Sequence, residues 1–317
     1  MVFTLRLINE PSNFTKLAGA FVIPSHPDIS VADNSLSSDP FTLGVVRTGS
    51  DAGAVERVND SLDKLDTLSA MLAEDTQYEV PALPFDLPVD FRLSIVVPVY
   101  NERDTIGRLL ARVHALPIPH ELVIVDDHST DGTVEILKEL ESIDEVRVIF
   151  KPQNEGKGAA LRTGFAEVTG DIVVVQDADL EYDPRDLLRL LPPLLNEEVD
   201  VVYGSRFLED TSVNSSWLHQ AGNRWLTTAS NLTTGLRLTD METCYKLVRR
   251  ELLQSLELKQ DRFGFEPEIT AKLARRGAKI RELPIGYEAR TWEEGKKIGI
   301  GDGLSALYCI ARYAFCD

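Results

Sequence analysis

The chain has 317 residues, of which 43% are hydrophobic, and this suffices for one large α/β domain with a smaller appendage. Its formal net charge of −18 argues against a sequence-independent DNA-binding protein, which needs a basic surface to displace counterions from phosphates. The 3 cysteines are an odd number without metal-ligand spacing, so they indicate neither a disulfide framework nor a zinc site and favour a reducing, cytoplasmic setting.

The first 90 residues are more acidic than the rest, with 5 Lys and Arg against 14 Asp and Glu. Residues 26–60 mix Ser, Asp, Gly and Asn with few aromatics, which is typical of disordered chain. Four leucines at helical spacing then predict a short amphipathic helix before a proline-interrupted linker at 80–84: Leu62, Leu65, Leu68 and Leu72. We expect residues 1–90 to be an acidic, partly disordered linker or docking segment, with regulation of the active site as the alternative.

From residue 91 the pattern changes to apolar strands that alternate with amphipathic helices. The predicted order is strand 93–99, helix from 102, strand 122–125, helix from 131, strand 146–150, helix from 156 and strand 172–176. Strands that are apolar throughout imply a mostly parallel sheet covered by helices on both faces, a doubly wound α/β fold over residues 91–317. Ligands in such folds bind at the carboxyl ends of the strands.

Two polar clusters follow the first two strands. The first is Pro98-Val99-Tyr100-Asn101-Glu102, and the second runs from Asp126 and Asp127 to Thr133. Asp131 or Ser129 would serve equally well as a helix cap. The adjacent carboxylates of Asp126 and Asp127 would repel each other at a sheet edge, and a base or ribose that donates hydrogen bonds would relieve them.

A third cluster follows the strand at 172–176. Asp177, Asp179 and Glu181 stand at alternate positions, so in an extended segment their carboxylates would point to one side and converge on one divalent cation. We expect Mg²⁺ or Mn²⁺, which would neutralise a diphosphate as it leaves. The alternative is a solvated acidic turn.

Lys157 lies between glycines at the start of the helix from 156, where the helix N-terminus and the lysine offer positive potential to a phosphate. The segment lacks the P-loop pattern. Close packing of a glycine-rich helix start explains it equally well.

These motifs occur in the order seen in family-2 glycosyltransferases with a GT-A fold, and the chain most resembles the dolichyl-phosphate or polyprenyl-phosphate mannosyl- and glucosyltransferases. The resemblance implies inverting transfer of a hexose from a GDP-mannose-like or UDP-glucose-like donor to a polyprenyl phosphate. It implies that Pro98, Tyr100, Glu102 and Asp127 hold the nucleotide with Lys157 and Asp177, and that Asp177, Asp179 and Glu181 surround the metal. The family often has Gln where this chain has Glu181.

The second half supplies candidates for an anionic acceptor. Arg206 follows a strand at 199–203, and its planar fork suits phosphate oxygens. Arg224 lies in a predicted helix at 217–236, off an apolar stripe: Leu218, Ala221, Trp225, Leu232 and Leu236. Arg224 is therefore either an acceptor-phosphate ligand or a solvated surface residue. By resemblance, Asp240 and Glu242 lie near the acceptor, and we expect Asp179, Arg206, Asp240 and Glu242 to carry the catalytic role.

Residues 290–298 are similar to the late Arg…Gly-x-Ser-Lys signature of the mannosyltransferases, with one extra residue and Lys296 in place of Ser. We expect Arg290 and Lys297 to approach the diphosphate from a mobile loop that closes over the donor, or else to belong to a charged surface loop. Residues 263–268 lead a helix at 269–275 and either orient the site or pack through their aromatic rings.

A last helix is predicted at about 301–315. It has one apolar face, formed by Ile300, Leu304, Leu307, Tyr308, Ala311 and Phe315. This face would lie in a membrane interface or pack on its own domain. No apolar run reaches the roughly 18 residues of a spanning helix and no secretory pattern opens the chain, so we expect a cytoplasmic protein with peripheral membrane contact at most.

The sequence thus predicts a metal-dependent hexosyltransferase that acts on a polyprenyl phosphate. Such an acceptor is already ionised near neutral pH and needs no strong base. A hydroxyl acceptor would need a carboxylate base, for which Asp240 or Glu242 would be the place to look. The third possibility is a protein that binds a nucleotide-sugar without chemistry.

Overall fold

The computed structural model describes residues 78–141, 145–208, 217–290 and 300–315, together with three short strands near the N-terminus. The chain divides into two compact units, Met1–Asn59 and Asp60–Asp317. In the first unit, β1 (Val2–Phe3), β2 (Ile29–Val31) and β3 (Val45–Arg47) form an antiparallel sheet in the order β1-β3-β2. The helix expected around 62–72 lies outside the described residues.

The second unit is built on a seven-stranded sheet in the order β10-β8-β9-β7-β4-β5-β6. Its strands are β4 (Leu93–Val99), β5 (His120–Asp126), β6 (Val146–Phe150), β7 (Ile172–Val175), β8 (Val201–Ser205), β9 (Lys246–Arg249) and β10 (Ile280–Pro284). Only β9 within this sheet runs antiparallel to its neighbours, β7 and β8. The expectation of a mostly parallel sheet is confirmed.

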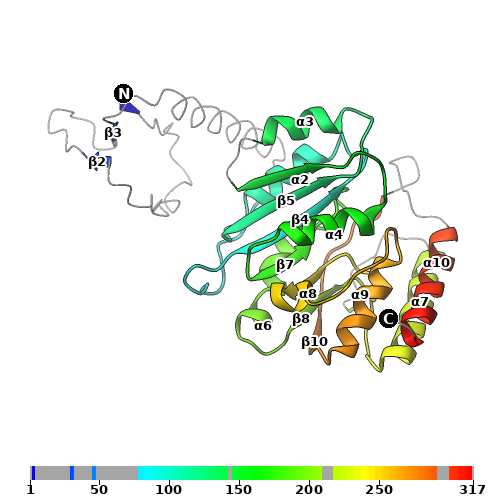
Figure 1. The fold of residues 1–317 in the computed structure, drawn as a ribbon. Coiled ribbons are helices and arrows are strands. Elements are labelled where there is room, and N and C mark those ends of the chain that lie inside the picture. The colour runs from blue at the N-terminus through cyan, green and yellow to red at the C-terminus, as the bar shows by residue number, and fades with distance from the viewer. Residues whose placement is uncertain are drawn as a thin grey trace. The chain divides into compact units, whose positions relative to one another are not determined.

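Helices lie on both faces of this sheet, with α4 in front of the strands in Figure 1 and α7, α9 and α10 grouped together. Their bounds are α2 (Ile106–His114), α3 (Thr133–Leu140), α4 (Lys157–Glu167), η1 (Pro184–Asp186), α5 (Leu187–Leu190), α6 (Pro192–Leu195), α7 (Trp217–Thr234), α8 (Arg250–Gln254), α9 (Phe265–Arg275) and α10 (Ile300–Phe315). None of the helices in the described part of the chain combines the length and apolar character needed to cross a bilayer.

The strand order places the candidate site. β4 pairs with β5 on one side and with β7 on the other, although β7 is the third strand after β4 in the chain. The direction of winding therefore reverses at β4, and the loops that follow β4, β5 and β7 leave the same edge of the sheet. The strands form this centre because their apolar runs are buried, as in Ile95, Val96 and Val97 of β4.

Two helices begin later than the sequence predicts. The first begins at Ile106 and not at Glu102, because Asn101 takes a left-handed φ of 52° and the Glu102 amide donates to Thr133 Oγ1. The second begins at Thr133 and not at Asp131, because Gly132 has a φ of 102°. Residues at the starts of these two helices join the loop after β4 to the loop after β5.

The apolar stripe predicted for α7 is wrong. Trp225 is 58% exposed and Leu232 is 83% exposed, while Thr227 and Ser230 are buried. The polar face turns inward because Thr227 Oγ1 accepts from the Met241 amide, which a leucine could not do. α7 ends at Thr234, so Leu236 lies beyond it.

The last helix forms as predicted but buries a different face. α10 packs on α7 and α9 through Ala306, Cys309, Ile310 and Tyr313, all of which are buried. Leu304 and Tyr308, which belong to the predicted apolar face, are 67% and 64% exposed.

Candidate active site

The loops after β4 and β5 hold each other in place. The Asn101 amide donates to Ser129 Oγ at 2.9 Å, and the Thr130 amide donates to Asn101 Oδ1 at 2.8 Å. Asp131 accepts from the Thr133 amide two residues on, but the N-cap of α3 is Gly132, so neither Asp131 nor Ser129 caps this helix. Tyr100 keeps 39% of its surface exposed at this edge. A rigid platform with an exposed aromatic ring results.

The two neighbouring carboxylates after β5 differ in their partners. Asp127 is buried and accepts from the amides of Glu155 at 3.0 Å and Gly156 at 2.6 Å, with Lys151 Nζ at 3.4 Å. The chain's own donors therefore compensate this charge, and the expectation that a ligand must do so is wrong for Asp127. Asp126 accepts from the Ser129 amide through Oδ2, while its buried Oδ1 has no hydrogen-bond partner among the described residues.

Lys157 and Asp177 form an ion pair at the start of α4. Lys157 Nζ lies 2.8 Å from Asp177 Oδ1, 2.9 Å from Oδ2 and 3.6 Å from Glu266 Oε1. Burial alone would lower the pKa of Lys157, but the charges of Asp177 and Glu266 raise it well above the ordinary value. Lys157 thus stays cationic and draws the loop after β7 toward α4.

Close packing accounts for the glycines that flank Lys157. A Cβ at Gly158 would lie 2.3 Å from Gln260 O, and one at Gly156 would lie 2.6 Å from Asp261 O. The Ala159 amide donates to Asp261 O at 3.0 Å. The glycines let the chain before α9 approach the helix start, which is the packing role that the sequence left open.

The acidic segment after β7 is a turn. Leu180 has a left-handed φ of 64°, and Asp179 Oδ1 accepts from the Glu181 amide at 3.1 Å. Glu181 accepts from Tyr287 Oη at 2.7 Å and from the Arg290 amide at 2.8 Å. The prediction of an extended segment is wrong, because the chain turns at Leu180 and the loop after β10 binds the Glu181 carboxylate.

Asp179 is a carboxylate of this turn whose pKa is raised by its surroundings. Its burial, together with the charges of Asp177 and Glu181, raises its pKa to about 7, although Arg290 opposes the shift. Arg290 Nε donates to Asp179 O at 2.7 Å, and Arg290 Nη2 lies 2.9 Å from Glu102 Oε2. Arg290 therefore ties the loops after β4 and β7 together.

The donor set suits a hard divalent cation, since crowded carboxylate oxygens are relieved by positive charge. The three carboxylates do not converge, however: Asp177 is paired with Lys157, and Glu181 is bound by Tyr287 and Arg290. Throughout the described ranges, no group of three or more His, Cys, Asp or Glu side chains is arranged to hold a metal ion.

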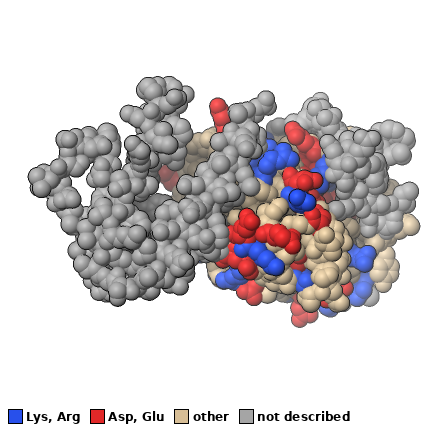
Figure 2. All heavy atoms as spheres, turned by 90° about the horizontal axis from the view of Figure 1, so that it is seen from above, with Lys and Arg blue, Asp and Glu red and all other residues tan. Residues whose placement is uncertain are grey.

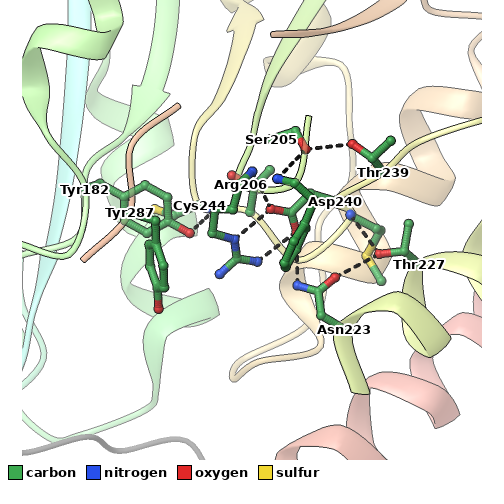
Figure 3. A network of polar contacts seen from close by, with 12 residues as sticks. Tyr182, Ser205, Arg206, Asn223, Thr227, Thr239, Asp240, Cys244 and Tyr287 are labelled. Atoms are coloured by element: carbon green, nitrogen blue, oxygen red, sulfur yellow. Dashed lines mark hydrogen bonds and ion pairs between the residues drawn. The ribbon is translucent and has the colours of Figure 1, made fainter. Parts of the chain in front are cut away.

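A second ion pair lies at the end of β8 (Figure 3). Arg206 Nε donates to Asp240 Oδ2 at 2.6 Å and Nη2 donates to Oδ1 at 2.8 Å, while Asn223 Nδ2 donates to Asp240 Oδ1 at 3.0 Å. Asp240 is fully buried, and the Arg206 side chain is 12% exposed. Burial would raise the pKa of Asp240, but Arg206 holds it below the ordinary value.

Two glutamates and one threonine each bury a side-chain oxygen that no group in the described part of the chain binds. Glu242 Oε1, Thr243 Oγ1 and Glu266 Oε2 are buried without a hydrogen-bond partner among the described residues. Burial and the charge of Glu266 raise the pKa of Glu242 to about 8, against the opposing effects of Lys246 and Arg206. Buried acceptors without donors are rare in proteins and mark places where a ligand can donate.

The remaining predicted residues are less enclosed or lie elsewhere. Arg224 is exposed on α7, next to Trp225, which the predicted stripe had placed inside. Lys297, with the rest of the loop at 291–299, lies outside the described residues. On the face seen in Figure 2, Lys and Arg lie next to Asp and Glu and do not form a patch of one sign.

Sequence reasoning missed the roles of Tyr287 and Glu266. Glu266 belongs to residues 263–268, which the sequence predicts either to orient the site or to pack through aromatic rings, and it lies 3.6 Å from Lys157 Nζ. Tyr287 carries no local signal, because it meets Glu181 from 106 positions away in the chain.

Comparison with known proteins decides the family. A family model described as "Glycosyl transferase family 2" matches residues 94–257, just over half of the chain. The chain belongs to this family. The glycosyltransferase fold expected from the motifs is thereby confirmed, and the matched residues include both ion pairs.

Two curated relatives of this family 2 chain act on lipid phosphates according to their names. The undecaprenyl-phosphate 4-deoxy-4-formamido-L-arabinose transferase of Aeromonas hydrophila is 29% identical over 210 residues, covering 64% of this chain and 62% of that protein. The dolichol-phosphate mannosyltransferase of Pyrococcus furiosus is 31% identical over 233 residues, covering 70% and 64%. The chain therefore spans less than two thirds of the length of either relative.

Solved structures of the glucosyl-3-phosphoglycerate synthase of Mycobacterium tuberculosis share the fold. Its complex with Mn²⁺, UDP and phosphoglyceric acid superposes with a TM-score of 0.56 at 21% identity, covering 74% of this chain and 88% of that one. Its complex with Mg²⁺ and UDP gives a TM-score of 0.54 at 21% identity, covering 80% and 84%.

Proposed function

We propose that this family 2 chain transfers a hexose from a nucleoside-diphosphate sugar to a polyprenyl phosphate. The observation that carries the proposal is the pair of enclosed ion pairs at one sheet edge, Lys157–Asp177 and Arg206–Asp240, together with the buried oxygens of Glu242 and Glu266 that lack a partner among the described residues. Such a reaction needs two anionic groups, a diphosphate and an acceptor phosphate, on either side of a sugar rich in hydroxyl donors.

The donor would bind over the loops after β4, β5 and β7. Tyr100 offers an exposed ring to the base, and Pro98, Glu102 and Asp127 shape the platform, Asp127 by holding the backbone of residues 155–156. Arg290 and Lys157 supply cations to the diphosphate. The structural neighbours that contain UDP support a nucleotide as a ligand of this fold.

Asp177 and Asp179 would hold Mg²⁺ or Mn²⁺, with Glu181 contributing only after its contacts with Tyr287 and Arg290 open. When bound, the cation would neutralise the diphosphate and stabilise the negative charge that grows on it as it leaves. The neighbours that contain Mn²⁺ or Mg²⁺ beside UDP support this choice of ion.

Arg206 would hold the acceptor phosphate, because its guanidinium keeps free N–H groups beyond those that bind Asp240. Asp240 keeps the fork rigid, and Asn223 of α7 supports Asp240 in turn. A phosphate monoester is largely ionised near neutral pH, so no protein base is needed. The residues act by alignment, and attack from the side opposite the leaving diphosphate inverts the anomeric carbon.

The exposed apolar side chains of α7 and α10 support a lipid-linked acceptor. Trp225 and Leu232 of α7 and Leu304 and Tyr308 of α10 are all more than half exposed, and the two helices are in contact. Trp and Tyr favour the boundary between water and lipid. Arg224 neighbours Trp225 and would meet the acceptor phosphate or a lipid headgroup from the solvent side.

A hydroxyl acceptor is the second candidate, and one observation favours it. Glu242 combines a pKa of about 8 with an unpartnered buried oxygen, which are properties of a general base. In that case Glu242 would take the proton of an attacking hydroxyl.

The two candidates separate in a partition assay. GDP- and UDP-hexoses labelled in the sugar are incubated with Mg²⁺ or Mn²⁺ and either a short polyprenyl phosphate or the corresponding polyprenol. Label that enters the organic phase only with the phosphate supports the proposal. Transfer to the polyprenol, or label recovered only in water-soluble products, overturns it in favour of the hydroxyl acceptor.

A further inference from the structure

Tyr78 joins the segment before β4 to the end of the acidic turn, at Asp183. It is the one buried side chain within residues 78–90. Its ring lies between two guanidinium groups, with Arg112 Cζ 4.8 Å and Arg185 Cζ 4.5 Å from its centre. Its hydroxyl donates to Asp183 Oδ1 at 3.3 Å. The two cations stacked on the ring and the carboxylate at its hydroxyl together hold Tyr78 in place.

The same cluster holds the end of the turn. Arg185 Nε and Nη2 donate to Asp183 Oδ2 at 2.9 and 2.5 Å, and Asp183 Oδ1 accepts from the Arg185 amide at 2.9 Å. Arg185 Nη1 also donates to Glu79 O at 3.2 Å, next to Tyr78 in the chain. Burial and the charge of Asp183 raise the pKa of Tyr78, so its hydroxyl remains a donor.

Asp183 is joined to the candidate metal and donor residues by a short rigid path. It follows Tyr182, which is buried against the rings of Tyr245 at 4.9 Å and Tyr287 at 5.3 Å between centres. Tyr287 in turn binds Glu181. Lys157 and Arg290 thus hold the first part of the turn, at Asp177 and Asp179, and Tyr78 holds its end at Asp183.

We propose that Tyr78 is a positioning residue for the donor site, which holds the turn from Asp177 to Asp183 in the geometry that binds a nucleoside diphosphate. This rests on the proposed function for the identity of the ligand. It assigns to the segment before the sheet a part in the site that neither the motifs nor the relatives' names indicate.

The test compares Tyr78→Ala with Tyr78→Phe, which keeps the stacked ring and loses only the hydroxyl bond. Arg147→Ala is the matched control, because it removes an exposed ion pair with Glu167 at another edge of the fold. Hydrogen exchange is followed in peptides that cover residues 177–187. We expect exchange there to rise about tenfold in Tyr78→Ala and to stay within about threefold in Tyr78→Phe and the control.

Binding of UDP and GDP with Mg²⁺ is measured on the same proteins by calorimetry. We expect the Kd of the preferred nucleotide to rise about tenfold in Tyr78→Ala, with the KM of the acceptor unchanged. Unchanged exchange and unchanged nucleotide affinity in Tyr78→Ala overturn the proposal, and so does an acceptor KM that rises as much as the donor KM.

If Tyr78→Ala does not fold, Arg112→Ala removes one face of the stack and leaves Tyr78 and the turn in place. Faster exchange confined to residues 177–187 in that variant supports the proposal, and unchanged exchange overturns it. The exchange readout needs no ligand. A wild-type chain that binds neither nucleotide would therefore count against the proposed function, while exchange would still decide the role of Tyr78.

Discussion

Some of the N–H groups of the Arg206 guanidinium bind Asp240, whose side chain has no exposed surface. Removal of one partner of such a pair leaves an uncompensated buried charge, whose cost exceeds the net stabilisation that the pair provides. The site therefore depends on this pair for its fold as well as for any ligand.

We expect Arg206→Ala to lower the free energy of unfolding by about 3 kcal/mol. The control is Arg281→Ala, whose partner Glu198 is 48% exposed and which should cost less than about 1 kcal/mol. Urea unfolding measures both. Equal losses in the two variants would mean that Asp240 is not enclosed as described.

Glu242 predicts a pH dependence of stability. Its pKa in the folded chain is raised from 4.5 to about 8, so the folded state binds the proton more tightly than the unfolded state. Stability should therefore fall as the pH rises from about 4.5 to about 8, by at most about 1.4 kcal/mol per pH unit for this group.

Glu242→Gln should flatten that slope, because glutamine does not ionise. Urea unfolding at several pH values between about 4.5 and 8 measures this slope. The control is Glu167→Gln, which changes a carboxylate that is 46% exposed. The account of Glu242 fails if its variant keeps the wild-type slope.

At the level of single residues, the sequence predicted which groups reach the sheet edge and missed how they pair. Asp177 and Arg206 follow apolar strands, so their position depends on local pattern alone. The partners Glu266 and Tyr287 come from α9 and from the loop after β10, and no local pattern encodes contacts made across such distances in the chain. For the same reason the extended segment was favoured over the turn at Leu180, since Tyr287 and Arg290 bind Glu181 from far along the chain.

Among the elements, the start of α4 combines close packing with the Lys157–Asp177 pair. We expect Gly158→Ala to destabilise the chain by about 1–3 kcal/mol, because its Cβ would lie 2.3 Å from Gln260 O.

The matched control is Gly222→Ala in α7, where a Cβ meets nothing within 4 Å. It should stabilise the chain by about 0.5–1 kcal/mol, because alanine is the better helix former. Thermal unfolding separates the two variants. Changes of the same sign at both glycines would contradict the packing described at α4.

The elements themselves were largely predictable, because apolar strands and amphipathic helices alternate from β4 onward. The inward face of α7 was not. Hydrophobic periodicity assigns Trp225 and Leu232 to the core, but a buried network of Asn223, Thr227 and Asp240 takes the inner position and leaves the apolar side chains outside. Hydrophobic periodicity indicates that a helix has an apolar face, but it does not indicate whether that face is buried or exposed.

For the molecule as a whole, the exposed side chains of α7 and α10 predict binding to lipid bilayers. We expect the double variant Trp225→Ser, Tyr308→Ser to lower cosedimentation with vesicles of phosphatidylcholine and phosphatidylglycerol about tenfold. Val89→Ser is the control, since Val89 is 92% exposed in the segment before β4. If the double variant and the wild type bind equally, the exposed side chains of α7 and α10 no longer support a lipid acceptor.

The central claim is that one sheet edge binds two anionic substrates, the donor at Lys157–Asp177 and the acceptor phosphate at Arg206. The most direct measurement is the steady-state rate of Arg206→Lys with both substrates varied, because lysine keeps the charge and loses the planar fork. The account predicts a KM for the polyprenyl phosphate raised about tenfold or more and a donor KM within about twofold of the wild type. A donor KM that rises as much as the acceptor KM, or an acceptor KM that does not change, would contradict it.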